Sequence, residues 1–229
     1  MGTKVTSAEA ASRSGDGTVS DRVLDELRRR IASQDVLPGT PLREQHLANE
    51  FGVSRARIRD TFGILEERGL IERIPNRGAI VSRLEADGIY KLLDVREVLE
   101  AQMVRLATEN APGETWDELV ALFGSSMTDA LAMNDFGTYE NAIHQFRQQC
   151  IAVMDNDVLS GLLDSLYDRT RVLIRRLVLV PGRAHEGMLQ HREILSAMRT
   201  GDAEKAERLK RANIRSAREW FRNYQAYLM

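Results

Sequence analysis

The chain has 229 residues, of which 43% are hydrophobic, so it can bury a substantial core and is not disordered as a whole. Its 32 basic and 34 acidic residues give a net charge of -2, whereas a nucleoid-type architectural DNA binder needs a large basic excess. A single cysteine, Cys150, excludes a disulfide framework, and there is neither a long apolar run nor a signal-peptide core, so we expect a soluble cytoplasmic protein without membrane contact.

The first third of the chain predicts a small domain of short elements. Residues 1–19 are rich in Ser, Gly, Ala and Thr and lack apolar periodicity, so we expect a disordered arm. Helical spacing of apolar residues then predicts a helix from Ser20 to the break at residues 37–39, a short helix near 43–50, and a third near 54–68. Two β-prone runs, 71–74 and 79–81, flank a turn and predict a hairpin.

The remainder of the chain is helical in pattern from about residue 84. Turn residues divide it into about six helices of 15–25 residues, as in a helix bundle. Residues 20–84 hold 12 basic and 10 acidic side chains, and residues 85–229 hold 18 and 22. We therefore expect a mainly α protein with two domains: a more basic one at 20–84 and an all-helical one at 85–229.

The short helices of the first domain suggest a helix-turn-helix. A Gly-containing turn joins them, and the second helix opens with Ser54-Arg55-Ala56-Arg57-Ile58-Arg59. Arg55 and Arg59 are one helical turn apart, so both can face outward and bind guanine edges or phosphates. Spacing alone leaves open that these arginines form only a solvated helix face, with Asp60 and Glu66 as partners.

This region resembles the N-terminal domain of GntR-family bacterial transcription regulators. The resemblance rests on Leu37, Pro38, Gly39, Leu42, Glu44, Leu47, Ala48, Gly52, Val53, Ser54, Arg55, Arg59, Leu65, Gly69, Leu70, Arg77 and Gly78. It implies a winged helix-turn-helix in which Ser54, Arg55, Arg59, Arg77 and Gly78 contact double-stranded operator DNA. It also implies a homodimer on a palindromic site.

The helical region is similar to the FCD-type effector domain of the FadR branch of that family. The similar stretches are residues 93–100, 143–144, 190–198 and 201–206. The resemblance implies a dimerising domain that binds a small carboxylate in its cavity, often beside a divalent metal of the Zn, Ni or Mn type. Arg96 has Glu100 one turn on, and the spacing leaves open either a plain ion pair or an arginine that binds the effector carboxylate.

Four polar residues are candidates for a metal or effector site: Glu140, His144, His191 and Asn213. Glu140 and His144 are four residues apart and share a helix face, and an antiparallel bundle can bring the last two helices to the same cavity. The resemblance implies metal ligands in the order Asp, His, His and His, with Glu140 in place of Asp and Asn213 in place of the last His. Because an amide oxygen is a weaker ligand than imidazole for a zinc-like ion, Asn213 is alternatively an effector contact. The residues alone also allow His144 and His191 to be core histidines.

A metal-dependent hydrolase fused to a DNA-binding domain is the competing hypothesis. The chain has no GxSxG, P-loop or GxGxxG motif, and His185-Glu186 with His191 is not HExxH, because the second histidine comes two positions late. We therefore expect a regulator rather than an enzyme, and a repressor on the tendency of the family.

Overall fold

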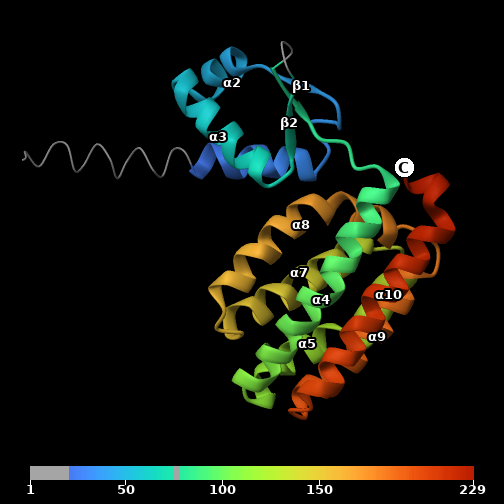
Figure 1. Ribbon diagram of the computed structural model, residues 1–229. Helices are drawn as coiled ribbons and strands as arrows, with labels where there is room; N and C mark the ends of the chain where they lie inside the picture. The colour runs from blue at the N-terminus through green and yellow to red at the C-terminus, as the bar shows by residue number, and fades with distance from the viewer. Residues whose placement is uncertain (1–20, 75–77) are drawn as a thin grey trace, which may run out of the picture. The chain divides into compact units, whose positions relative to one another are not determined.

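The computed structural model describes residues 21–74 and 78–229, which divide into two compact units on either side of the Arg83–Leu84 bond (Figure 1). Within these residues, no helix is both long and apolar enough to cross a membrane. The predicted arm at 1–19, the N-cap at Ser20 and the wing residue Arg77 lie outside the described residues.

The first unit contains three helices and a small sheet. A helix covers residues 21–32, followed by β1 (Pro41–Leu42), α2 (Glu44–Phe51), α3 (Arg55–Glu67), β2 (Ile71–Ile74) and β3 (Gly78–Val81). The apolar stripes that predicted the helices meet in one core, in which Leu27, Ile58 and Leu65 are at most 1% exposed. Between α2 and α3, Gly52 takes a left-handed φ of 66°, which glycine adopts without a Cβ penalty.

The sheet contains the predicted hairpin and one strand that was not predicted. β2 and β3 pair antiparallel with Ile71 opposite Val81, and β1 adds to the other side of β3 to give the order β1-β3-β2. A two-residue strand is too short to show alternation, and its Pro41 is tolerated because β1 is an edge strand. The unit is a winged helix-turn-helix.

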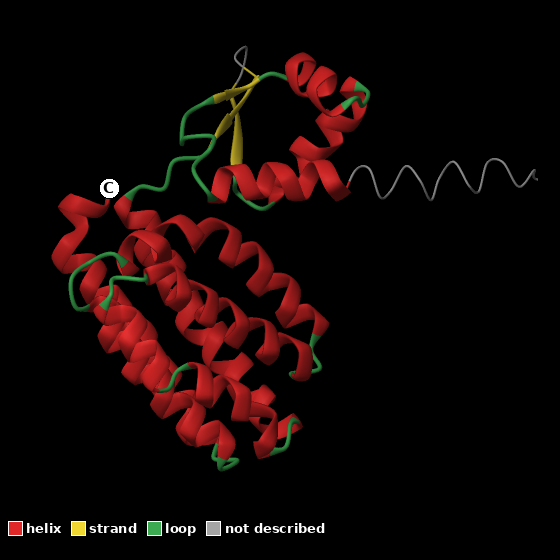
Figure 2. Cartoon of the chain, turned by 180° about the vertical axis from the view of Figure 1, so that it is seen from behind, coloured by secondary structure: helices red, strands yellow, loops and turns green. Residues whose placement is uncertain are grey.

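The second unit is a bundle without strands in its described residues (Figure 2). Its elements are α4 (Ala86–Asn110), a 3-10 turn at Gly113–Trp116, α5 (Asp117–Leu122), α6 (Ser125–Ala132), α7 (Phe136–Val153), α8 (Asp157–Val178), α9 (Arg183–Arg199) and α10 (Ala203–Leu228). α10 packs along α4 and α9. The predicted fold class, a mainly α chain with a winged N-terminal unit and a helical bundle, is confirmed.

The bundle has five long helices and, within the described residues, two short ones, instead of about six of similar length. The difference lies in the segment from Gly113 to Asn134, where three turns interrupt the helical pattern. Gly124 separates α5 from α6. A larger residue does not fit in this turn, because a Cβ there would collide with the carbonyl oxygen of Ala121. Asn134 ends the segment with a left-handed φ of 60°.

Candidate functional site

The N-terminal end of α3 presents a cationic surface. Ser54 is the N-cap, and its hydroxyl accepts a hydrogen bond from the backbone N–H of Arg57 at 3.2 Å. Arg55 and Arg59 point outward, with 58% and 55% of their side chains exposed. The first turn carries no acidic residue, so the positive end of the helix dipole and the arginines act together.

One glutamate of α2 binds both arginines. The Glu44 carboxylate lies 3.3 Å from Nη2 of Arg55 and 3.1 Å from Nη2 of Arg59. Hydrogen bonding to Arg59 outweighs partial burial and holds the pKa of Glu44 below its usual range, so this group is ionised at neutral pH. Asp60 and Glu66, the partners considered from spacing, make no ion pair with Arg55 or Arg59 in the described residues. Glu44 is the partner instead, because tertiary packing brings α2 alongside α3.

The hairpin of β2 and β3 contacts α3 through Arg73 of β2. Nη2 of Arg73 donates to the backbone carbonyl of Arg59 at 3.3 Å, and its Nε lies 3.0 Å from Glu66. Gly78, at the start of β3, is exposed and has a left-handed φ of 78°, a conformation that favours glycine. The structure thus places Ser54, Arg55, Arg59 and Gly78 on the described surface of the unit; their contacts with DNA remain predictions.

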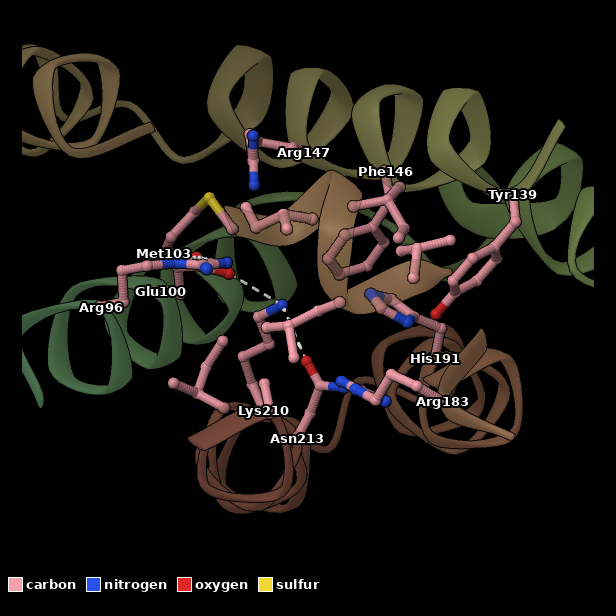
Figure 3. A pocket seen from close by; sticks show the side chains of 16 residues that line it. Arg96, Glu100, Met103, Tyr139, Phe146, Arg147, Arg183, His191, Lys210 and Asn213 are labelled. Atoms are coloured by element: carbon pink, nitrogen blue, oxygen red, sulfur yellow. Dashed lines mark hydrogen bonds and ion pairs between the residues drawn. The ribbon is translucent and has the colours of Figure 1, made fainter. Parts of the chain in front are cut away.

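The second unit contains a partly open cavity of about 50 Å³ between α4, α7, α8, α9 and α10 (Figure 3). Apolar side chains such as Phe146 and Ile174 form part of its wall. The titratable residues that line it are Arg96, Glu100, Tyr139, Arg147, Arg183, His191 and Lys210. Four of these are cationic and one is a carboxylate, so the lining carries a net formal charge of +3 when His191 is neutral.

At one end of the cavity, the cations are paired. Arg96 and Glu100 are 6% and 1% exposed, and Nε of Arg96 donates to Oε1 of Glu100 at 2.6 Å. Nζ of Lys210 lies 2.9 Å from the other oxygen, Oε2. Burial alone raises the pKa of Glu100, but the charges of Arg96, Lys210 and Arg147 outweigh it and hold this pKa far below its usual range.

The Arg96–Glu100 spacing therefore produces a buried ion pair that also lines the cavity. The ion pair that the spacing allowed is present, whereas contact of Arg96 with an effector carboxylate remains a prediction. Because Glu100 occupies its guanidinium, Arg96 is a weaker candidate for an effector contact than the unpaired cations of the same cavity.

At the other end, two buried groups have no partner for one polar atom. Arg183 is 8% exposed and its Nη1 makes no hydrogen bond within the described chain; the same holds for Nε2 of His191, which is 4% exposed. Nδ1 of His191 lies 2.8 Å from the carbonyl oxygen of Gly187. Burial lowers the pKa of His191 to about 3, so the ring is neutral at physiological pH.

Gly187 of α9 leaves room for the polar ends of Tyr139 and Arg183. A Cβ at this residue would collide with the hydroxyl of Tyr139 and lie 2.8 Å from Nη1 of Arg183. Glycine therefore lets both polar side-chain ends close over the helix. Burial raises the pKa of Tyr139 above its usual range, so its hydroxyl stays protonated.

Arg147 and Asn213 lie between the two ends of the cavity. The guanidinium carbon of Arg147 is 3.2 Å from the centroid of the Tyr167 ring, a cation–π contact. Asn213 accepts from Nζ of Lys210 at 3.3 Å and donates to Gln190 at 2.7 Å. Asn213 thus lines the cavity, and its contact with an effector remains a prediction.

The four residues predicted as metal ligands do not converge. His191 and Asn213 line the cavity, but His144 is exposed and Glu140 pairs with Arg175 of α8 at 3.6 Å. The large side chains of Tyr139 and Phe146 turn the opposite face of α7 inward, and at 100° per residue His144 lies about 140° from Tyr139. Among the described residues, no three His, Cys, Asp or Glu side chains are grouped to hold a metal ion.

The cavity lining also does not fit a divalent cation. Its carboxylate, Glu100, already binds Arg96 and Lys210 with its two oxygens. The positive charges of Arg147 and Arg183 would repel a metal cation in the cavity. The expectation of a Zn, Ni or Mn type ion at Glu140, His144, His191 and Asn213 is therefore not supported by the donor set.

Several lining residues were missed from the sequence: Arg147, Arg183 and Lys210. A usable signal existed on α9, where Arg183, Gly187 and His191 recur at intervals of four and so share one face. Lys210 and Asn213 are three apart on α10 in the same way. Arg147 follows Phe146 directly and gave no signal, because neighbouring residues on a helix point in different directions.

Two family models match the chain. Residues 19–81 match the model described as bacterial regulatory proteins of the gntR family, and residues 91–216 match the FCD domain. The HTH-type transcriptional repressor RspR of Escherichia coli (strain K12) is 26% identical over 195 residues, covering 83% of each chain. The gluconate operon transcriptional repressor of Bacillus licheniformis is 42% identical over 100 residues, which are 43% of this chain and 39% of that protein.

A solved structure agrees with the fold. E. coli McbR/YncC superposes with a TM-score of 0.72 at 19% identity and covers 90% of this chain and 98% of its own. The matched models and relatives are DNA-binding regulators, which decides against the competing hydrolase hypothesis. The chain therefore belongs to the GntR family of bacterial DNA-binding transcriptional regulators and carries an FCD domain as its second unit.

Proposed function

We propose that this regulator is a cytoplasmic repressor that binds a palindromic operator as a homodimer, and that a small carboxylate bound in the FCD domain weakens operator binding. The observation that carries the proposal is a cavity lined by buried side chains of net positive charge in a chain whose other unit is a winged helix-turn-helix. A buried cation without a counter-ion is costly, and an anionic ligand would offset that cost.

The DNA-binding half of the proposal rests on α3. Arg55 and Arg59 are exposed at the end of the helix that enters the major groove in this motif, and arginine binds both guanine and phosphate. One chain offers one such helix, so a two-fold operator needs two copies with recognition helices one DNA turn, roughly 34 Å, apart. Repression is favoured by the names of both related proteins, RspR and the gluconate operon repressor.

The test begins with finding the operator. Genomic fragments enriched by the purified protein would be sequenced, and the shared motif would be used in fluorescence anisotropy titrations. We expect a two-fold motif and a sedimenting dimer. At least one small organic acid should weaken binding by about 5- to 150-fold, the usual range of allosteric coupling. A monomer on DNA, or operator affinity that no bound acid changes, would contradict the proposal.

A further inference from the structure

The unpaired end of the FCD cavity specifies the chemistry of its ligand. Buried polar atoms in proteins are nearly always hydrogen-bonded, so each exception needs an explanation. Here two exceptions line the same cavity: Nη1 of Arg183 and Nε2 of His191. Both residues lie on α9 and flank Gly187, and Figure 3 shows their side chains at the same end of the cavity.

Arg183 requires an acceptor with negative charge. Arginine keeps its proton in proteins and offers only donors, so a carboxylate is its natural partner. No carboxylate of the described residues lies within ion-pair distance of Arg183. The charge of Glu186 acts on Arg183, but the oxygens of Glu186 accept from Ser216 and Trp220. The ligand must therefore bring the anion.

His191 requires a donor. Its Nδ1 faces the carbonyl oxygen of Gly187 at 2.8 Å, which places the single ring proton on Nδ1. Nε2 then carries a lone pair and can accept a hydrogen bond. A ligand ammonium group could also donate, but the net positive charge of the lining would repel it. A hydroxyl group is the donor that the charges allow.

A metal ion is the other species that could use the Nε2 lone pair. It would need further anionic or imidazole ligands, and the described lining offers neither beside His191. The three arginines of the lining stay charged and outnumber its one carboxylate even without Lys210, so the cavity repels a divalent cation.

We propose that this cavity binds a small hydroxycarboxylate directly, without an intervening metal ion, with the carboxylate on Arg183 and the hydroxyl donating to Nε2 of His191. This inference rests on the proposed function of the FCD domain as an effector site. It assigns Arg183 and His191 as specificity-determining residues.

The first experiment measures binding of matched acids to full-length protein that has been dialysed against EDTA. The pairs differ only in hydroxylation: lactate and propanoate, malate and succinate, gluconate and hexanoate. We expect at least one hydroxy acid to bind about tenfold more tightly than its counterpart by calorimetry, as one added hydrogen bond allows. Added Zn²⁺ or Mn²⁺ should change this affinity less than about twofold.

The second experiment changes the two residues. His191→Phe keeps a ring where His191 stacks on Phe123, at 5.1 Å between centroids, but removes the lone pair. We expect the preference for the hydroxylated acid to disappear while the unhydroxylated acid binds as before. His185→Phe, at an exposed position of the same helix, is the matched control and should keep the preference.

Arg183→Met separates a binding role from a structural one. We expect affinity for the acid to fall by about 10- to 100-fold, as for a hydrogen bond to a charged group. The ligand-free variant should unfold at the same or a higher temperature, because a buried charge without a partner is replaced by an apolar side chain of similar length. Arg199→Met, at an exposed residue of α9, should leave affinity unchanged.

The outcomes distinguish this inference from the proposed function. Binding that EDTA abolishes and a metal restores would overturn the inference, and so would equal binding of each hydroxylated pair or no binding of any acid. If Arg183→Met destabilised the protein and left affinity intact, Arg183 would be structural only. A hydroxy acid that binds as described but leaves operator affinity unchanged would overturn the proposed function alone.

Discussion

Both units of this protein place one glutamate between two cations, and they differ in burial. On the winged unit, Glu44 bridges Arg55 and Arg59 at the surface, and its carboxylate side chain is 27% exposed. In the FCD domain, Glu100 bridges Arg96 and Lys210 with at most 7% of any of these side chains exposed. Water screens the first cluster and not the second, so the same chemistry carries very different energies.

The difference fits the roles that we propose for the two clusters. In that proposal the surface arginines exchange a carboxylate for DNA, which an exposed ion pair permits because it contributes little. The buried cluster in turn keeps its geometry when a ligand binds beside it. Removing one member of a buried pair strands a charge in a medium that cannot solvate it.

The largest effect that we expect is for Glu100→Gln. Loss of the carboxylate leaves Arg96 and Lys210 buried without a counter-ion, which should lower the free energy of unfolding by about 3–5 kcal/mol. Urea unfolding followed by circular dichroism measures this. Glu109→Gln, an exposed residue on α4 that pairs with Arg105 at 2.9 Å, is the matched control. If both variants lost the same small amount, the buried cluster would not differ in kind from a surface pair.

The pH dependence of stability should reveal that the His191 ring is buried and neutral in the folded chain. Burial lowers its pKa from 6.5 to about 3 in the folded chain. Below pH 6.5, therefore, the unfolded chain binds a proton that the folded chain does not, and stability falls as the pH falls, by at most about 1.4 kcal/mol per pH unit. His191→Phe should flatten the curve between pH 6.5 and 5, and the exposed His185→Phe should not. Parallel curves for the parent and His191→Phe would contradict the neutral, buried state of this ring.

Arg55→Ala and Arg59→Ala should weaken operator binding while leaving the fold intact. Each arginine that reads a base contributes about 5- to 150-fold in affinity, as measured by anisotropy on the operator. Arg208→Ala, an exposed change in the FCD domain, serves as the control. Full operator affinity in both variants would remove α3 from the DNA interface.

The smallest effect should come from Glu44→Gln. Its exposed pairs contribute at most about 1 kcal/mol to the free energy of unfolding. Removal of a negative charge beside Arg55 and Arg59 should nevertheless strengthen binding to nonspecific DNA by a few-fold at low salt, because the local charge becomes more positive. A loss of stability as large as that of Glu100→Gln would show that burial is not what separates the two clusters.

The cationic surface at the N-terminal end of α3 was predictable, because it depends only on residues that are close together in the sequence. The N-cap Ser54, the apolar stripe through Ile58 and Leu65, and the arginines beside that stripe are all set within one helix. A helix whose apolar face is known has a known outer face. What spacing could not supply was Glu44 as the partner of both arginines, since it lies on another helix.

The cavity of the FCD domain was predictable only in part, because its lining residues come from several helices. An interval of four identifies residues that share a face, as for Glu140 and His144, but does not say which face turns inward. Packing of Tyr139 and Phe146 on α7 made that choice and left His144 exposed. His191 and Asn213 of the last two helices do line the cavity, where the resemblance to the FCD domain and an antiparallel bundle led us to expect them. Their contacts with a ligand remain predictions.

By itself, the sequence determined the apolar faces of the long helices, the N-cap Ser54 and the outward arginines of α3, because each depends on periodicity and charge over a few neighbouring residues. Only the tertiary structure decided that Glu100 pairs with both Arg96 and Lys210, while Arg183 and His191 each keep one atom without a partner among the described residues. The physical reason is that electrostatic pairing depends on distance across packed helices and on the exclusion of water. Neither quantity is written in the spacing of residues along one chain.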